Sequence, residues 1–229
     1  DQPRKFVNRI SNIGIDEPLG IEIKGEPKPI FPHPDDKNWN GLSLPWMAYG
    51  YGISLTPLQI LTFYNSIANN GEMVKPKFLE KVVNSVENDH KFKKEIINSS
   101  ICSKKTLKII NKMLYDVVHH PNGTANNIKS KYFGISGKTG TAQIDYSTDS
   151  INYNSSFVGF FPSDKPKYSC IITINKPNKK LGYYGSTVAG PVFKNIAEKI
   201  MSKYPNYLEF SLEEIERGLI SNKITSTNQ

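Results

Sequence analysis

The chain has 229 residues, of which 38% are hydrophobic and 22% charged, and its formal net charge is +8. This composition is typical of one globular domain and excludes a disordered chain. The lysines are spread along the chain without a run of about five or six like charges, and the aromatic residues show no RNA-binding signature. We therefore expect a solvated basic surface and no nucleic-acid partner. An anionic membrane surface or an acidic polymer is the alternative partner.

Cysteine and histidine spacing indicates no metal site. Cys102 and Cys170 belong to no C-x-x-C motif, and their pairing and redox compartment stay open. The adjacent His119 and His120 point in different directions on any regular element. No run approaches the roughly 18 apolar residues of a membrane span. Because the first residue is Asp1 and not methionine, we expect a fragment or a processed product.

The first part of the chain predicts one short helix followed by an irregular segment. Pro3 stands in the first turn of this helix and Gly14 at its C-terminal cap position. Five prolines between Glu17 and Trp39 forbid a long regular element there, so we expect an extended surface segment. The apolar residues at helical spacing are Phe6, Val7, Ile10 and Ile13.

Three further helices are predicted. One begins at Thr56, where Pro57 and Gln59 fit a capping box, and ends at Gly71. The second covers about residues 103–118, and the third follows the strands. Their expected apolar stripes are Leu58, Leu61, Tyr64, Ile67 and Ala68; Leu107, Ile110, Leu114 and Val117; and Val188, Val192, Ile196 and Ile200, widened by Ala189, Phe193 and Ala197.

After residue 130 the hydrophobic period changes to two. Tyr132–Gln143, Asn154–Phe161 and Tyr168–Lys176 are rich in β-branched and aromatic residues and predict consecutive antiparallel strands. The fold class is therefore α+β, an antiparallel sheet flanked by helices. We expect one domain portion over 1–204 and an appended segment with a flexible tail over 205–229.

The sequence GISGKTGTAQ at 134–143 combines a lysine, two threonines and three glycines. Glycine weakens a strand and often marks close approach of a ligand or of another backbone. We interpret the stretch as a strand edge beside an extended substrate, in which a lysine and hydroxyls receive a carboxylate. An ordinary polar turn or strand is the alternative. Regular alternation places Ser136, Lys138 and Gly140 on one side and Gly137, Thr139 and Thr141 on the other.

K-T-G belongs, with S-x-x-K and S-x-N, to the motif set of penicillin-binding proteins and serine β-lactamases. The chain resembles the transpeptidase domain of class B penicillin-binding proteins over most of its length. Its YYGSTVAGPVF stretch is more similar to the septal, cell-division type than to the elongation type. The stretches that carry the resemblance are MAYGYGISLTPLQILTFYNSIANNGEMVKP from Met47, PNGTA from Pro121, GKTGTAQ from Gly137, SSFVGFFP from Ser155 and YYGSTVAGPVF from Tyr183.

The resemblance implies the penicillin-binding/serine β-lactamase-like fold, incomplete at the N-terminus. No serine of the chain is followed three residues later by lysine, so S-x-x-K is absent from these 229 residues. S-x-N occurs at Ser150 and Ser226, but both follow KTGT, against the family order. By the resemblance, both motifs, a membrane anchor and a pedestal domain lie upstream of Asp1, and the isolated chain is inactive.

The resemblance also implies a peptidoglycan D,D-transpeptidase that forms a serine acyl-enzyme without metal or organic cofactor. Lys138 would be catalytic, holding proton balance and substrate charge, and the main-chain N–H of Thr141 would complete the oxyanion hole. For Gln143 and the two tyrosines a structural role is equally open. The implied substrate-binding residues are Thr139, Gly140, Thr141, Gln143, Tyr183 and Tyr184.

The implied ligands are D-Ala-D-Ala stem peptides and β-lactams, and the implied partners are cell-division or elongation membrane proteins. The expected location is the bacterial cytoplasmic membrane, with the catalytic domain on its periplasmic or extracytoplasmic side. A β-lactamase or carboxypeptidase is a close variant. The alternative from another class is a non-catalytic module of the same fold that senses cell-wall peptides or binds division partners.

Overall fold

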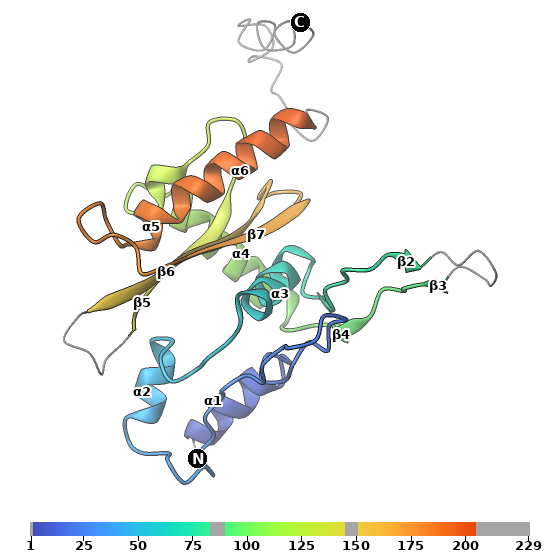
Figure 1. Cartoon of the computed structure of the whole chain (residues 1–229), viewed down its shortest axis with the longest axis vertical. Helices are drawn as coiled ribbons and strands as arrows, with labels where there is room; N and C mark the ends of the chain where they lie inside the picture. Colours follow the sequence, from blue (N-terminus) through green and yellow to red (C-terminus); the bar gives the residue numbers. More distant parts are fainter. Residues whose placement is uncertain (1, 83–89, 145–150, 205–229) are drawn as a thin grey trace, which may run out of the picture.

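A three-stranded antiparallel sheet lies at the centre of the computed structural model, which describes residues 2–82, 90–144 and 151–204 (Figure 1). Its order is β5-β6-β7, with β5 at Ser136–Ile144, β6 at Asn152–Phe161 and β7 at Tyr168–Asn175. The predicted meander is confirmed. The first strand begins four residues later than predicted, because the chain turns at Tyr132, whose N–H donates to Ser130 Oγ at 3.3 Å.

Helices cover both faces of the sheet. The helix α6 (Gly190–Lys203) packs on one face, and α3 (Pro57–Ala68) and α4 (Lys104–His119) pack toward the other. In Figure 1 the sheet runs between α6 and α3. Side chains alternate along β6, so that Phe157 and Phe161 join the cluster with α6, while Phe160 joins the cluster with α3 and α4.

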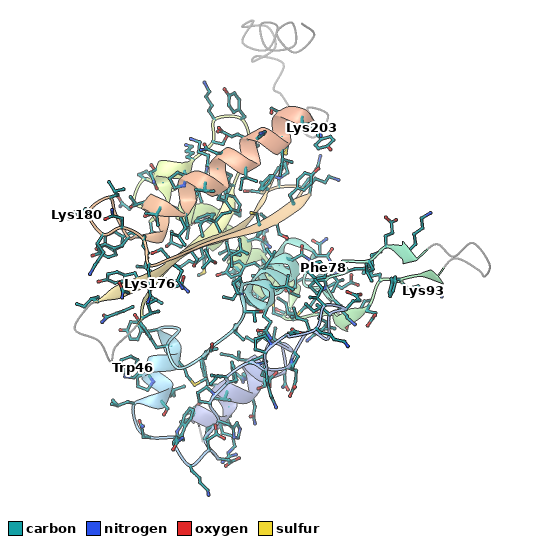
Figure 2. The ribbon with its side chains drawn as sticks, in the orientation of Figure 1. Trp46, Phe78, Lys93, Lys176, Lys180 and Lys203 are labelled. Carbon is teal, nitrogen blue, oxygen red and sulfur yellow. The ribbon has the colours of Figure 1, made fainter. Side chains whose placement is uncertain are left out.

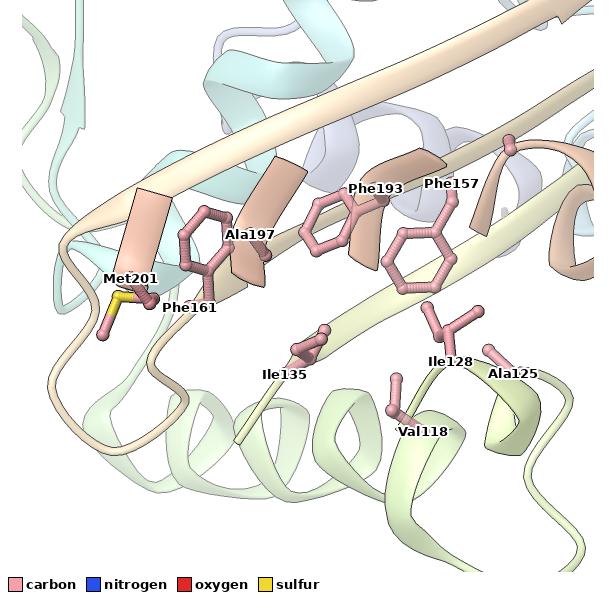
Figure 3. Packing of buried hydrophobic residues seen from close by; sticks show 10 residues of the cluster. Val118, Ala125, Ile128, Ile135, Phe157, Phe161, Phe193, Ala197 and Met201 are labelled. Carbon is pink, nitrogen blue, oxygen red and sulfur yellow. The ribbon is translucent and has the colours of Figure 1, made fainter. Parts of the chain in front are cut away.

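The larger core cluster is aromatic and lies between β6 and α6 (Figure 3). The ring centroids of Phe157 and Phe193 are 4.8 Å apart and the rings meet edge to face. Phe161 makes a second edge-to-face contact with Phe193 at 5.7 Å. Such pairs stabilise a core beyond the area that they bury.

The apolar stripe predicted for the last helix is wrong by one position. The fully buried residues are Ala189, Phe193, Ala197 and Met201, whereas Val192 is 41% exposed. Both stripes have i+4 spacing, and the sheet selects the one whose phenylalanine fits between the rings of β6 while two alanines allow close approach.

The capping box of α3 is confirmed, but its buried face is more polar than predicted. Thr56 Oγ1 accepts the N–H of Gln59 at 3.1 Å, and Gln59 Oε1 accepts the N–H of Thr56 at 2.8 Å. Gln59, Thr62 and Ser66 are buried together with Ile67. The two hydroxyls donate to carbonyl groups of their own helix, so burying them leaves no orphaned donor.

Small elements surround this centre. Residues 17–39 are irregular, as predicted, and Arg4 pairs at 2.5 Å with Asp35 to hold this segment to the first helix. The short helix α2 and the paired strands before α4 were not predicted, because each is too brief to show a period. They are α1 (Gln2–Ser11), α2 (Ser43–Ala48), β1 (Met73–Val74) with β4 (Ile96–Asn98), β2 (Lys81–Val82) with β3 (His90–Lys91), a 3₁₀ turn at Asn126–Ile128, and α5 (Gly185–Val188).

Lysines extend from many elements, as Figure 2 shows for Lys93, Lys176, Lys180 and Lys203. Cys102 and Cys170 are free and pack against different clusters, on opposite faces of the sheet. Burial raises the pKa of the Cys170 thiol. No helix within the described ranges is both long and apolar enough to cross a membrane. The predicted tail at 205–229 lies outside the described residues.

Replacing Phe193 by alanine should lower the free energy of unfolding by about 3–5 kcal/mol, because it empties the space between Phe157 and Phe161. Urea denaturation measures this change. The matched control is Val192→Ala on the exposed side of the same helix, which should stay within about 0.5 kcal/mol. Equal losses in the two variants would contradict the packing described.

Candidate active site on the edge strand β5

The outer edge of β5 is covered at its start and open afterwards. The N–H of Ile135 donates to His119 Nε2 of α4 at 3.2 Å, and Tyr115 stacks on the imidazole at 4.0 Å. The other edge of β5 pairs with β6 over its whole length. Within the described part of the chain, no strand pairs with the outer edge.

Antiparallel alternation decides which main-chain groups point outward. Because the N–H of Ile135 points away from β6, the N–H and C=O groups of every second residue after it also do so. These residues are 137, 139, 141 and 143. The main-chain N–H of Thr141 therefore faces outward, as an oxyanion donor must, and no hydrogen bond to it is present among the described residues.

Lys138 lies on the side of the sheet that faces α3 and α4, opposite Val158 of β6. Its side chain is exposed, and Nζ donates to the outward carbonyl of Thr139 at 2.9 Å. The ammonium group thus lies beside the open edge, where it can reach a negatively charged ligand.

Thr139 and Thr141 lie on the opposite side of the strand, as predicted from alternation. Thr139 Oγ1 is 3.5 Å from Thr124 Oγ1, in the loop after α4. Thr141 Oγ1 accepts the buried N–H of Gly185 at 3.0 Å, which ties β5 to the start of α5. Thr124 was missed as a site residue, although it belongs to the PNGTA stretch that supported the family resemblance.

The Thr124 loop is held from both ends. A Cβ atom at Gly123 would lie 2.4 Å from the carbonyl oxygen of Val117, so only glycine fits this turn. Asn126 Nδ2 donates to the carbonyl of Val118 at 3.2 Å, at the C-terminal end of α4. Asn127 Nδ2 donates to the carbonyl of Ser186 at 2.8 Å. The loop is thereby fixed between α4 and α5, next to β5.

The glycines of this strand make room for other backbone. A Cβ atom at Gly137 would lie 2.5 Å from the carbonyl oxygen of Val158. One at Gly185 would lie 2.6 Å from the carbonyl oxygen of Gly140 and 2.2 Å from that of Ser156. Of the two reasons considered for glycine here, close approach of another backbone therefore applies within the chain itself.

Three tyrosines form a stack beside the threonine side of the strand. Tyr183 stacks on Tyr153 with centroids 4.2 Å apart, and its hydroxyl donates to that of Tyr184 at 3.1 Å. This hydrogen bond raises the pKa of Tyr184, which is 56% exposed. Tyr153 is the direct cross-strand partner of Gln143, so Gln143 shares this side. Tyr153 was missed, although strand alternation places it there.

The structure thus brings Lys138, Thr139 and Thr141 together at the open edge, and places Gln143, Tyr183 and Tyr184 on the threonine side. Over the described ranges, no group of three or more His, Cys, Asp or Glu side chains is arranged to hold a metal ion. The arrangement can take an extended peptide along β5 and offers one inward-facing cation and hydroxyl groups for an anion.

An antiparallel sheet with helices on both faces and a K-T-G edge strand defines the fold of the penicillin-binding transpeptidases. Residues 2–198 match the family model "Penicillin binding protein transpeptidase domain". The chain belongs to this family, and it is part of a class B, FtsI-like transpeptidase domain.

Among curated relatives, peptidoglycan D,D-transpeptidase FtsI of Buchnera aphidicola subsp. Baizongia pistaciae is 35% identical over 199 residues, covering 86% of this chain and 33% of the relative. Stage V sporulation protein D of Bacillus subtilis is 29% identical, covering 84% and 29%. The crystal structure of penicillin-binding protein 3 from Mycobacterium tuberculosis with ampicillin is 26% identical with a TM-score of 0.79, covering 92% and 48%. The chain spans about a third of the curated relatives' length.

Replacing Thr141 by valine should lower the free energy of unfolding by about 1–3 kcal/mol, because the buried N–H of Gly185 loses its acceptor. Thr141→Ser keeps the oxygen and is the matched control, expected to lose far less. Urea denaturation of the two variants separates these outcomes. A valine variant as stable as the serine variant would show that the hydrogen bond is unimportant.

His119 should make stability depend on pH. Burial lowers the pKa of His119, as does the positive charge of Lys129. The neutral ring accepts the N–H of Ile135, and the protonated ring cannot. Since the folded-state pKa lies below the unfolded value of about 6.5, stability is complete above about pH 6.5 and declines as pH falls toward the folded-state pKa.

Urea midpoints of the wild type and His119→Gln, measured from about pH 8 to about pH 5, test this dependence. Glutamine offers an acceptor oxygen that does not titrate in this range. The wild type should lose more stability on acidification than the variant. Parallel pH profiles would remove His119 as the cause.

Proposed function

We propose that this chain is part of a peptidoglycan D,D-transpeptidase that cross-links stem peptides through a serine acyl-enzyme and binds β-lactams. The observation that carries the proposal is the outward-facing N–H of Thr141 on an edge strand that also holds Lys138 and Thr139. Family membership supports it, as does the ampicillin complex of a structural relative.

In the proposed reaction a stem peptide lies along the outer edge of β5 as an added strand, bonded to the outward main-chain groups. The terminal carboxylate is received by the hydroxyl of Thr139 and the ammonium of Lys138, with Thr141 adding a second hydroxyl. The hydroxyl of Thr141 accepts from Gly185 and still has a proton to donate.

The chemical steps need a serine that these 229 residues do not contain in an S-x-x-K context. Its oxygen attacks the carbonyl carbon of the penultimate D-Ala and loses its proton to a base. The terminal D-Ala leaves with a proton on its amine. An acceptor amine then attacks the ester, forms the cross-link and returns the proton to the serine. The N–H of Thr141 stabilises the oxyanion in both steps.

We further propose the cellular setting that this activity requires. The substrate lies outside the cytoplasmic membrane, so the catalytic domain faces the periplasmic or extracytoplasmic side and acts with division or elongation membrane proteins. The nucleophile, an anchor and a pedestal domain come from sequence outside this chain. Residues 1–204 belong to the catalytic domain, and 205–229 form an appended segment.

The second candidate is a non-catalytic module of the same fold that binds cell-wall peptides or division partners. The absence of S-x-x-K from the 229 residues favours it. The outer edge of β5 serves equally as a peptide-binding edge without a nucleophile. The two candidates differ in covalent chemistry alone.

Covalent labelling by a fluorescent penicillin tests the proposed function. The 229-residue chain should show no denaturation-resistant band, and the protein expressed with its native upstream sequence should show one. Lys138→Ala in the longer protein should slow labelling by about a hundredfold or more, since it removes a proton-transfer group.

Lys131→Ala removes the same charge from an exposed lysine outside the site and should label at the wild-type rate. A covalent band on the 229-residue chain would contradict the missing nucleophile. An unlabelled longer protein that still binds stem peptide would establish the non-catalytic module.

A further inference from the structure

A pocket of about 390 Å³ lies away from β5, where the C-terminal end of α3 meets β1 and the start of β7. Four lysines line it: Lys75, Lys77, Lys94 and Lys167. No carboxylate lines it among the described residues, and no lining residue belongs to β5 or α5. The feature is therefore separate from the candidate active site.

The carboxylates that pair with these lysines are fewer than the lysines. Glu95 Oε2 lies 3.3 Å from Lys75 Nζ and is 64% exposed, and Glu72 pairs with Lys94. Lys77 Nζ donates to a main-chain carbonyl, that of Phe92, at 3.4 Å. The three lysines on this side thus share two carboxylates. This side of the pocket is positive even before Lys167 is added from the β7 side.

The pocket is concave, which strengthens the field of its lysines, since low-dielectric walls focus charge into a cleft. Asn65 Oδ1 accepts from Ser169 Oγ at 2.9 Å, which fixes this amide and leaves its N–H groups as donors. Val74, Pro166 and Tyr168 supply an apolar wall. A ligand that fits both surfaces has a multiply charged anionic group and a less polar body.

We propose that this pocket binds a phosphate-bearing ligand with at least two negative charges. Lysine ammonium groups bind phosphate as point charges, whereas planar carboxylates are matched best by the fork of arginine, which the pocket lacks. A single carboxylate also carries too little charge for four ammonium groups. The phosphate comes either from a soluble ester or from a lipid headgroup.

Calorimetric titration of the 229-residue chain with inorganic pyrophosphate tests the site. We expect saturable binding that weakens as salt is added, because exposed charges are screened. The double variant Lys77→Gln/Lys167→Gln should bind at least about tenfold more weakly. The control Lys104→Gln/Lys108→Gln makes the same charge change on the exposed side of α4 and should retain wild-type affinity.

Flotation with vesicles of phosphatidylglycerol, against phosphatidylcholine, separates the two sources. Pyrophosphate binding that depends on Lys77 and Lys167 assigns a soluble ligand. Binding to phosphatidylglycerol vesicles alone, lost in the same double variant, assigns a headgroup. Binding to neither, or equal loss in the α4 control, overturns the proposal. Urea midpoints of both double variants within about 0.5 kcal/mol of wild type show that the fold is intact.

Discussion

The cross-strand pair Thr141 and Ser155 joins the candidate site to the core. Thr141 Oγ1 accepts the N–H of Gly185, and Ser155 Oγ donates to the carbonyl of Tyr183. These bonds hold the turn before α5 on the sheet, and the missing side chain of Gly185 allows its backbone to touch that of Gly140. The position of α6, and hence the Phe193 contact, follows from this docking, so the same two strands bind the core and present the site.

The sequence was sufficient where one physical signal dominated. The capping box at Thr56 and Gln59 is local, so it predicted the start of α3 without knowledge of the fold. Strand alternation likewise placed Lys138 and Thr139 on opposite sides. The antiparallel order followed from short strands joined by short turns. These features need only neighbouring residues, and the structure confirms them.

Features that depend on the tertiary partner were missed or misplaced. In α6 two stripes have the same spacing, and only the rings of Phe157 and Phe161 decide that Phe193 and not Val192 is buried. Thr124 is fifteen residues before Thr139 and reaches it only because α4 lies along the start of β5. Neither outcome can be read from periodicity, because period gives a direction on an element and not the identity of its neighbour.

The division of β5 into a covered start and an open continuation explains why one strand can serve both stability and binding. At Ile135 the outward N–H is used by His119, so the strand is anchored to α4. From Lys138 onward the same row of outward groups has no strand beside it in the described part of the chain. An unpaired edge is a ready template for an extended peptide. A lysine and threonines at that point limit which peptide binds, because they favour one that ends in a carboxylate.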